Sequence, residues 1–130
     1  MPREIIHTTG APASPYFSQA VKAGPFVYLS GITGVDPATG KLAGSTIADQ
    51  ARQAIENCRA ILRAANSDLD DVVEVQILLT RPEDFAALNA VYAGFFPTEP
   101  PARSVAKLGV DVPNLLVSIK MTAYVAESGV

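Results

Sequence analysis

One arginine in the sequence stands out because of the residues that precede it. Arg103 comes shortly after Pro100 and Pro101 in the segment TEPPARSV, directly before a predicted strand. Each proline fixes its own φ at about −65° and restricts the residue before it, so the approach to Arg103 has little freedom. A guanidinium held in this way can bind a carboxylate through two parallel hydrogen bonds, which lysine cannot do. A surface pair with an acidic neighbour such as Glu99 is the alternative, and the local residues leave both interpretations open.

Other residues give little support for a metal, a cofactor or a protein nucleophile. With one histidine, His7, and one cysteine, Cys58, a transition-metal site would need mostly carboxylate ligands, and no acidic cluster has that pattern. The sequence contains no Gly-rich dinucleotide motif, P-loop, HExxH or GxSxG. Nothing beside His7 would orient it as a general base, and Cys58 falls on the apolar stripe of a predicted helix. We therefore expect cofactor-free chemistry or simple binding, with no metal.

The composition predicts one compact domain over residues 1–130 in a reducing compartment, by default the cytoplasm. Hydrophobic residues make up 48% of the chain, which is enough for a core, and no linker divides it. No window approaches the ~20 apolar residues of a membrane span, and the N-terminus lacks the apolar region of an export signal. The formal net charge is −3 and the basic residues are scattered, which disfavours a nucleic-acid partner.

Hydrophobic periodicity predicts the elements that must position Arg103. Apolar residues recur every three or four positions over residues 46–65, with Thr46 and Asp49 forming a capping pair, which indicates an amphipathic helix. A second helix is predicted from Pro82 to residue 96, because proline followed by acidic residues is typical of a first helical turn. Residue types and alternation predict strands at 3–8, 17–23, 26–30, 72–80 and 115–126, and a turn at 36–40.

This order of elements predicts an α+β domain in which two helices pack on one face of a single sheet. The opposite face of the sheet needs a cover, because apolar residues share it with polar ones, and a homo-oligomer is the economical way to provide one. The apolar residues assigned to that face are Val72, Leu78, Leu116 and Tyr124.

Several short segments together resemble one protein family, although each alone would be weak. They are 18–21 (SQAV), 29–31 (LSG), 50–57 (QARQAIEN), 84–89 (DFAALN), Tyr92, 95–97 (FFP) and above all 101–104 (PARS). Over nearly its whole length the sequence is similar to the RidA family, also called YjgF, whose relatives include endoribonuclease L-PSP-like proteins. The resemblance implies a chorismate-mutase-like fold, with a single mixed sheet and two helices on one face, assembled as a homotrimer.

The resemblance also implies a substrate and a reaction. In clefts between neighbouring subunits, Arg103 is expected to hold the carboxylate of a 2-imino acid, such as 2-iminopropanoate or 2-iminobutanoate, which is hydrolysed to a 2-oxo acid and ammonia. Backbone groups around Ser30 and Gly31 are expected to hold the imine end while a positioned water attacks C2, without metal or cofactor. Asn89 lies close to the cleft in the family, although its position also suits a helix-surface or cap residue.

Four positions differ from the pattern of the family. An ungapped alignment of the last strand places Ser118 where deaminase-active members typically carry a glutamate thought to orient the water. Val105 stands where many members have cysteine, and Ile32 where glutamine is common. Phe17 takes the position of a familiar tyrosine, unless a slip of one residue brings Tyr16 there instead. Serine cannot act as a carboxylate base, but its hydroxyl can hydrogen-bond a water.

Three functions stand as hypotheses. The first is an imine deaminase of the RidA type, which Arg103 supports and the missing glutamate weakens. The second is a cleft that binds small carboxylates, including 2-oxo acids, as a sensor or carrier without turnover, since the same arginine would serve it equally well. The third is an endoribonuclease or translation-inhibitor role, which the acidic composition and the lack of basic patches disfavour.

Overall fold

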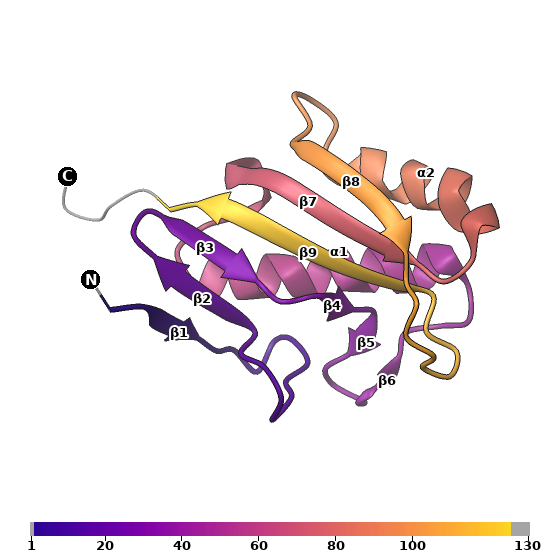
Figure 1. The fold of residues 1–130 in the computed structure, drawn as a ribbon, viewed down its shortest axis with the longest axis horizontal. Coiled ribbons are helices and arrows are strands. Elements are labelled where there is room, and N and C mark those ends of the chain that lie inside the picture. Colours follow the sequence, from indigo (N-terminus) through magenta and orange to yellow (C-terminus); the bar gives the residue numbers. More distant parts are fainter. Residues whose placement is uncertain (1, 126–130) are drawn as a thin grey trace.

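The centre of the molecule is a seven-stranded mixed sheet (Figure 1). The computed structural model describes residues 2–125. Strands β7 and β8 are parallel, and the other pairs of this sheet are antiparallel. The strands follow the order β1 (Glu4–Ile6), β2 (Ala20–Ala23), β3 (Phe26–Leu29), β9 (Val117–Tyr124), β7 (Val72–Leu79) and β8 (Ala102–Lys107), and β4 (Ile32–Thr33) also pairs with β9.

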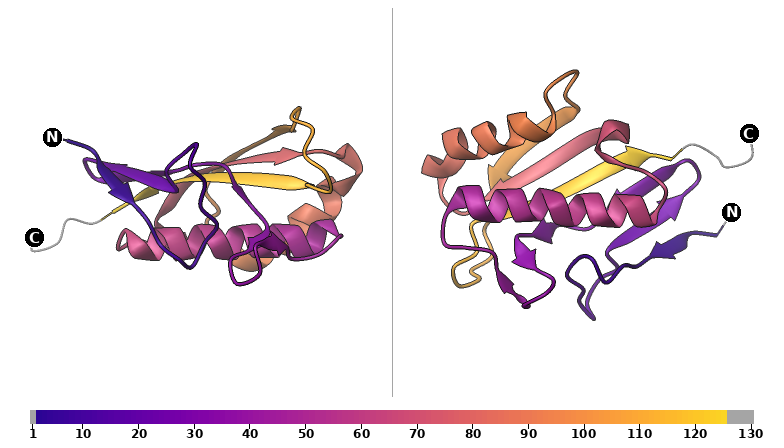
Figure 2. Two further views of the ribbon diagram at one scale, coloured as in Figure 1. Left: turned by 90° about the horizontal axis from the view of Figure 1, so that it is seen from below. Right: turned by 180° about the vertical axis from the view of Figure 1, so that it is seen from behind.

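Both helices cover the same face of this sheet, as the left view of Figure 2 shows. Helix α1 (Ile47–Ala64) packs on β9 and β4, and α2 (Phe85–Phe95) packs beside α1. This confirms the predicted α+β arrangement of two helices on one face of a mixed sheet. None of the helices in residues 2–125 is long and apolar enough to cross a membrane. The smaller elements are the ribbon of β5 (Val35–Asp36) and β6 (Lys41–Leu42) and the 3-10 helices η1 (Leu69–Asp71) and η2 (Pro82–Asp84).

Helix α1 forms where the sequence pattern predicts it, because a cap and an apolar stripe act together. The Thr46 hydroxyl accepts a hydrogen bond from the Asp49 N–H at 3.2 Å, which satisfies a free donor of the first turn. The buried stripe packs on β9 and includes Cys58, which is fully buried. Burial raises the pKa of the Cys58 thiol far above its usual range, so this cysteine is structural, as expected.

Two residues assigned to the outer face of the sheet belong to the core instead. Val72 is 8% exposed because a β-bulge directly after it shifts the alternation of β7. Leu116 is also 8% exposed, and it precedes β9, where its N–H donates to the side chain of the buried Gln50 at 2.9 Å. The predicted placement of Val72 and Leu116 was therefore wrong. Leu78 and Tyr124 do lie on the outer face, and Tyr124 is 46% exposed.

Several boundaries differ from those expected. Arg103 lies inside β8, which begins at Ala102, rather than ahead of a strand. The strand expected at 17–23 begins only at Ala20, and β9 begins at Val117 rather than at residue 115. Position 126, the expected end of the last strand, lies outside the described residues. Strands β4, β5 and β6 were not predicted, because two residues are too few to show alternation.

One buried amide holds the loop between β8 and β9 against α1. Gln50 Nε2 donates to the carbonyl of Asn114 at 2.9 Å and to that of Gly44 at 3.0 Å, while its Oε1 accepts from the Leu116 N–H. Gln50 is fully buried, so these bonds replace the water that the loop backbone would otherwise need. This anchor sets where β9 begins.

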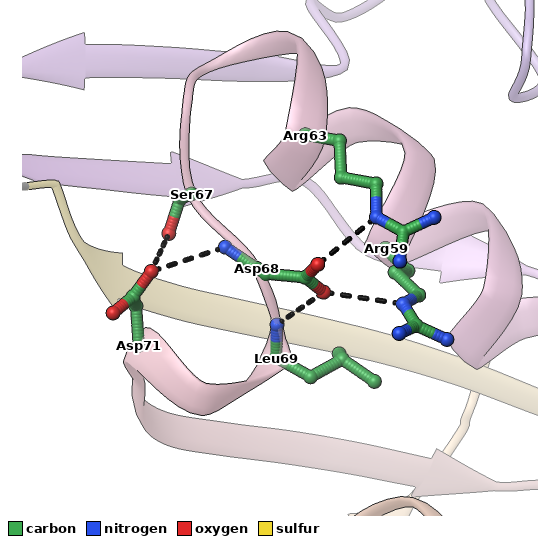
Figure 3. A network of polar contacts seen from close by, with 6 residues as sticks. All are labelled: Arg59, Arg63, Ser67, Asp68, Leu69 and Asp71. Carbon is green, nitrogen blue, oxygen red and sulfur yellow. Dashed lines mark hydrogen bonds and ion pairs between the residues drawn. The ribbon is translucent and has the colours of Figure 1, made fainter.

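A polar network closes the connection between α1 and β7 (Figure 3). The Asp68 carboxylate accepts from Arg59 Nε at 3.1 Å, Arg63 Nε at 2.9 Å and the Leu69 N–H at 2.7 Å, and the Asp68 N–H donates to Asp71 at 3.2 Å. Partial burial opposes ionisation of Asp68, but the Leu69 N–H and the two guanidinium groups outweigh it, so the pKa of Asp68 lies below its usual value. The ionised carboxylate therefore fixes the turn that leads into β7.

We expect Asp68→Asn to lower the free energy of unfolding by up to about 1 kcal/mol at pH 7, through loss of the charge that Arg59 and Arg63 stabilise, because asparagine caps the Leu69 N–H about as well as aspartate. The loss stays small because the Asp68 side chain is 39% exposed. Since the folded-state pKa is lowered, the wild-type contribution is present above the unfolded pKa of about 3.9 and is lost as the pH falls through the folded value.

Urea unfolding of wild type and Asp68→Asn at pH 7 and pH 3 measures this effect. The difference between the two proteins should narrow at pH 3. Asp70→Asn, at an exposed neighbouring carboxylate, serves as the matched control and should lower the free energy of unfolding by much less at pH 7. An equal difference between wild type and Asp68→Asn at both pH values would contradict the role assigned to the charge.

Candidate functional site

Arg103 lies on the helix-facing side of β8, and its guanidinium rests on α2. Its Nη1 donates to Asn89 Oδ1 at 2.8 Å. Its Cζ lies 4.8 Å from the centre of the Tyr92 ring and 5.9 Å from the centre of the Phe85 ring. A cation over an aromatic face is attracted by the ring quadrupole. Three side chains of one helix therefore hold the guanidinium in place.

These three side chains share one face of α2. Phe85, Asn89 and Tyr92 follow the spacing i, i+4 and i+7, which stacks side chains above one another along a helix. Sequence reasoning placed Asn89 near the cleft but named Phe85 and Tyr92 only among the residues that carry the family resemblance. The signal that could have found them is a polar residue between two aromatic residues on one face of the predicted second helix, which suggests a polar or cationic group opposite.

The guanidinium keeps most of its hydrogen-bonding capacity. An arginine has several N–H donors, and within residues 2–125 the Arg103 side chain donates only to Asn89. Among these residues it forms no ion pair, so the surface pair with Glu99 that the sequence allowed is not found. Arg103 is exposed, and Val105 follows it on the same face of β8, half-buried. The free donors are therefore open to an anionic ligand.

A second group of predicted site residues meets where β3, β4 and β9 join. Gly31 precedes β4, and Ser118 pairs with Thr33 of β4. A Cβ on residue 31 would lie 2.7 Å from Ser118 Oγ, so a larger residue at position 31 would force the Ser118 hydroxyl to move. We call this pair the Gly31–Ser118 junction. It brings the Ser118 hydroxyl directly over the turn that was expected to hold the imine.

Ser30 anchors the N-terminal loop. Its N–H donates to the Gln19 carbonyl at 3.0 Å, and its hydroxyl donates to the Ser18 carbonyl at 2.6 Å. Backbone groups of Ser30 and Gly31 were expected to hold the imine end of the substrate. The Ser30 N–H is not free for this role, because it already donates to Gln19. The Ser30 carbonyl and the Gly31 N–H are the backbone groups left for that role.

The N-terminal loop places Phe17 in a cavity beside Gly31. The buried Gln19 amide ties the loop down, since its Nε2 donates to three carbonyls within residues 8–12 at 2.9–3.1 Å. Phe17 and Gly31 both line a cavity of about 560 Å³, whereas Tyr16 is 92% exposed. Within one chain, Phe17 thus lines the cavity beside Gly31, and which of the two aromatic residues faces a cleft between copies stays a prediction.

Arg103 and Ser118 lie on opposite faces of the sheet within one chain. Arg103 pairs with Val75, which is buried against the helices, while Ser118 pairs with Leu78 on the outer face. Successive residues of a strand point to opposite faces, and three positions along a strand span about 10 Å. A molecule of a few carbon atoms therefore cannot contact both Arg103 and the Gly31–Ser118 junction of one chain.

Comparison with known proteins agrees with the resemblance seen in the sequence. Residues 8–125 match the family model described as Endoribonuclease L-PSP. The chain belongs to the L-PSP family. Within this family, a RutC family protein of Pyrococcus horikoshii is 41% identical over 124 residues, which cover 94% of this chain and 98% of that protein. The 2-iminobutanoate/2-iminopropanoate deaminase of Mus musculus is 40% identical over 104 residues, which cover 78% of this chain and 76% of that protein.

Solved structures share the L-PSP family fold with this chain. RidA from an Antarctic Psychrobacter species superposes with a TM-score of 0.88 at 38% identity, over 94% of this chain and 99% of that one. E. coli TdcF with bound serine gives a TM-score of 0.88 at 32% identity, over 95% and 99% of the two chains. The resemblance to the RidA family is thereby confirmed for both sequence and fold.

Substitutions of Tyr92 test how this chain holds the Arg103 guanidinium. The Tyr92 hydroxyl is buried and has no hydrogen-bond partner within residues 2–125. Burial raises the pKa of Tyr92, and the nearby Arg103 charge opposes this shift. Tyr92→Phe removes the unpaired hydroxyl and keeps the aromatic face, so we expect the free energy of unfolding to stay within about 0.5 kcal/mol or to rise.

Tyr92→Leu is the comparison, because it also removes the ring, and we expect it to cost about 1–3 kcal/mol. Urea unfolding of wild type and both variants measures these differences. A loss of more than about 1 kcal/mol in Tyr92→Phe would show that the hydroxyl is paired in solution.

Proposed function

We propose that the protein hydrolyses small 2-imino acids to 2-oxo acids and ammonia, with Arg103 holding the substrate carboxylate. The observation that carries this proposal is the exposed Arg103 guanidinium. Asn89 and Tyr92 hold it in place, and its remaining N–H donors can form two parallel hydrogen bonds with a carboxylate. The relative from Mus musculus is named for this reaction, and the serine in the TdcF structure is a small ligand with a carboxylate, which supports the proposal.

The reaction needs little from the protein beyond orientation of the imine and the attacking water. The carbon of a protonated imine is electrophilic, so water adds to C2, and the C–N bond of the resulting carbinolamine then breaks. The water supplies oxygen to C2 and two protons to nitrogen, which leaves as ammonium. Arg103 would fix the carboxylate and so present C2 to the water, and the Ser118 hydroxyl would hydrogen-bond that water in place of a carboxylate base.

We propose further that the complete site forms between copies of the chain in a homotrimer. A substrate on Arg103 of one copy reaches a Gly31–Ser118 junction only if a neighbouring copy supplies it, because the two groups lie on opposite faces of one sheet. The outer face of the sheet carries the aromatic residues Tyr28 and Tyr124, which are 45% and 46% exposed. Apolar surface of this kind favours association between copies.

Binding without turnover is the second candidate function. Ser118 favours it, because a hydroxyl stands where a carboxylate would activate water more strongly. The same Arg103 would then capture a 2-oxo acid or another small carboxylate for a sensor or carrier. The family model is described as an endoribonuclease, but a net charge of −3 gives no support to binding of a phosphate backbone.

Arg103→Lys tests the role of the guanidinium. We expect kcat/KM for 2-iminobutanoate, generated in the assay by a threonine dehydratase, to fall roughly 10- to 100-fold, because the two parallel hydrogen bonds are lost. The melting temperature should change by less than about 2 °C, since the side chain is exposed and makes one hydrogen bond. Arg52→Lys, at an arginine whose side chain is 57% exposed on α1, is the matched control and should change neither value.

Two results would overturn this proposal. A much lower melting temperature for Arg103→Lys would make the arginine a structural residue. Oxo-acid release by wild type no faster than in buffer, combined with Arg103-dependent binding of 2-oxo acids, would establish the binding function instead.

The shared site is tested by mixing two inactive variants. Arg103→Ala removes one half of the site, and Gly31→Val disturbs the other half, because its Cβ would meet Ser118 Oγ at 2.7 Å. When the two are co-expressed, about one site in four receives both intact halves, so about a quarter of the wild-type activity should return. Sedimentation of wild type should show a trimer. A stable monomer, or no recovery of activity, would contradict the shared site.

A further inference from the structure

An apolar groove lies near Arg103 along the helix-facing edge of the sheet. Its volume is about 400 Å³, and most of its walls are hydrocarbon side chains. Small-molecule sites are typically clefts of about 300–1,000 Å³ with apolar walls and a few polar groups. The groove has this size, and the guanidinium beside it is the polar group. The lining residues are Leu79, Pro82, Phe85, Val105, Ala106 and Lys107.

The groove and the arginine share a wall. Phe85 lines the groove, and the centre of its ring lies 5.9 Å from Arg103 Cζ. Val105 also lines it and follows Arg103 by two residues on the same face of β8, a spacing of about 7 Å. A molecule whose carboxylate is bound by Arg103 therefore has the groove directly beside it.

We propose that this groove binds the side chain of the acid and selects 2-imino and 2-oxo acids with apolar side chains of about four to seven carbons, such as isobutyl or benzyl. This inference rests on the proposed function for the carboxylate at Arg103. The methyl group of 2-iminopropanoate would leave the groove almost empty. Each further methylene that is buried raises affinity about fourfold, so larger apolar side chains gain most.

The charge at the end of the groove adds a second selection. Lys107 ends β8, and it is the charged residue among those that line the groove. With Arg103 beside the groove as well, a cationic side chain would meet two positive charges at short range. Acids derived from basic amino acids are therefore rejected by repulsion rather than by lack of space.

Binding of stable 2-oxo acids tests the selection independently of turnover. Calorimetric titration of wild type with 4-methyl-2-oxopentanoate and phenylpyruvate should give Kd values at least tenfold lower than with pyruvate. Imines generated by an amino-acid oxidase from leucine, phenylalanine and alanine should show the same order in kcat/KM. Equal affinities for the three oxo acids would overturn the inference, even if imines are hydrolysed.

Two variants locate the preference in the groove. Val105→Trp fills it, and Pro82→Glu places a carboxylate in its exposed wall at a position where a helix start tolerates glutamate. Each should reduce the Kd ratio of pyruvate to 4-methyl-2-oxopentanoate at least tenfold. Val112→Trp, at a 44% exposed valine in the loop before β9, is the matched control and should keep the ratio.

Thermal melts show whether each variant is folded, and the Pro82 variant decides the question if Val105→Trp is not. Unchanged ratios in the folded variants would show that the groove does not hold the side chain. If wild type hydrolyses no imine yet binds 2-oxo acids in the expected order, the proposed reaction fails while the groove assignment stands.

Discussion

The position of Arg103 depends on the parallel register between β7 and β8. Arg103 pairs with Val75, which places its side chain on the helix-facing side beside Asn89. A slip of one residue would turn the guanidinium to the outer face and remove it from α2. Within the described sheet β8 is an edge strand, so β7 alone sets this register. The Leu108 N–H extends the pairing past the strand by donating to the Leu79 carbonyl at 2.8 Å.

Three buried amide side chains hold the loops around the Gly31–Ser118 junction in place. Gln19 holds the loop that carries Phe17, and Gln50 holds the loop that leads into the strand of Ser118. Asn57 of α1 donates to the carbonyls of Thr33 and Val35, two and four residues after Gly31, at 3.0 and 2.8 Å. Each amide satisfies backbone groups that irregular segments leave unpaired. The helix-facing core thus fixes loops that no regular ladder would hold.

The sequence predicted the parts of this fold that depend on local periodicity. In α1, β7 and β9 the apolar residues recur at a regular spacing over eight or more residues. That is long enough for the pattern to be recognised in the sequence. Val72 was misplaced because one bulge reverses alternation without a sequence signal. Arg103 was identified from the prolines that precede it and from the PARS motif. The roles of Phe85 and Tyr92 could not be predicted, because they depend on which strand packs across from α2.

The way in which the guanidinium is held bears on how it can act. A carboxylate of the same chain would compete with any acid that binds Arg103, and breaking that pair would lower affinity. Among the described residues Arg103 has no such partner, and it rests instead on a neutral amide and two aromatic rings. These contacts restrict the side chain without neutralising its charge. An incoming carboxylate then meets an oriented cation with no ion pair to displace, so its binding energy is available to position the rest of the molecule.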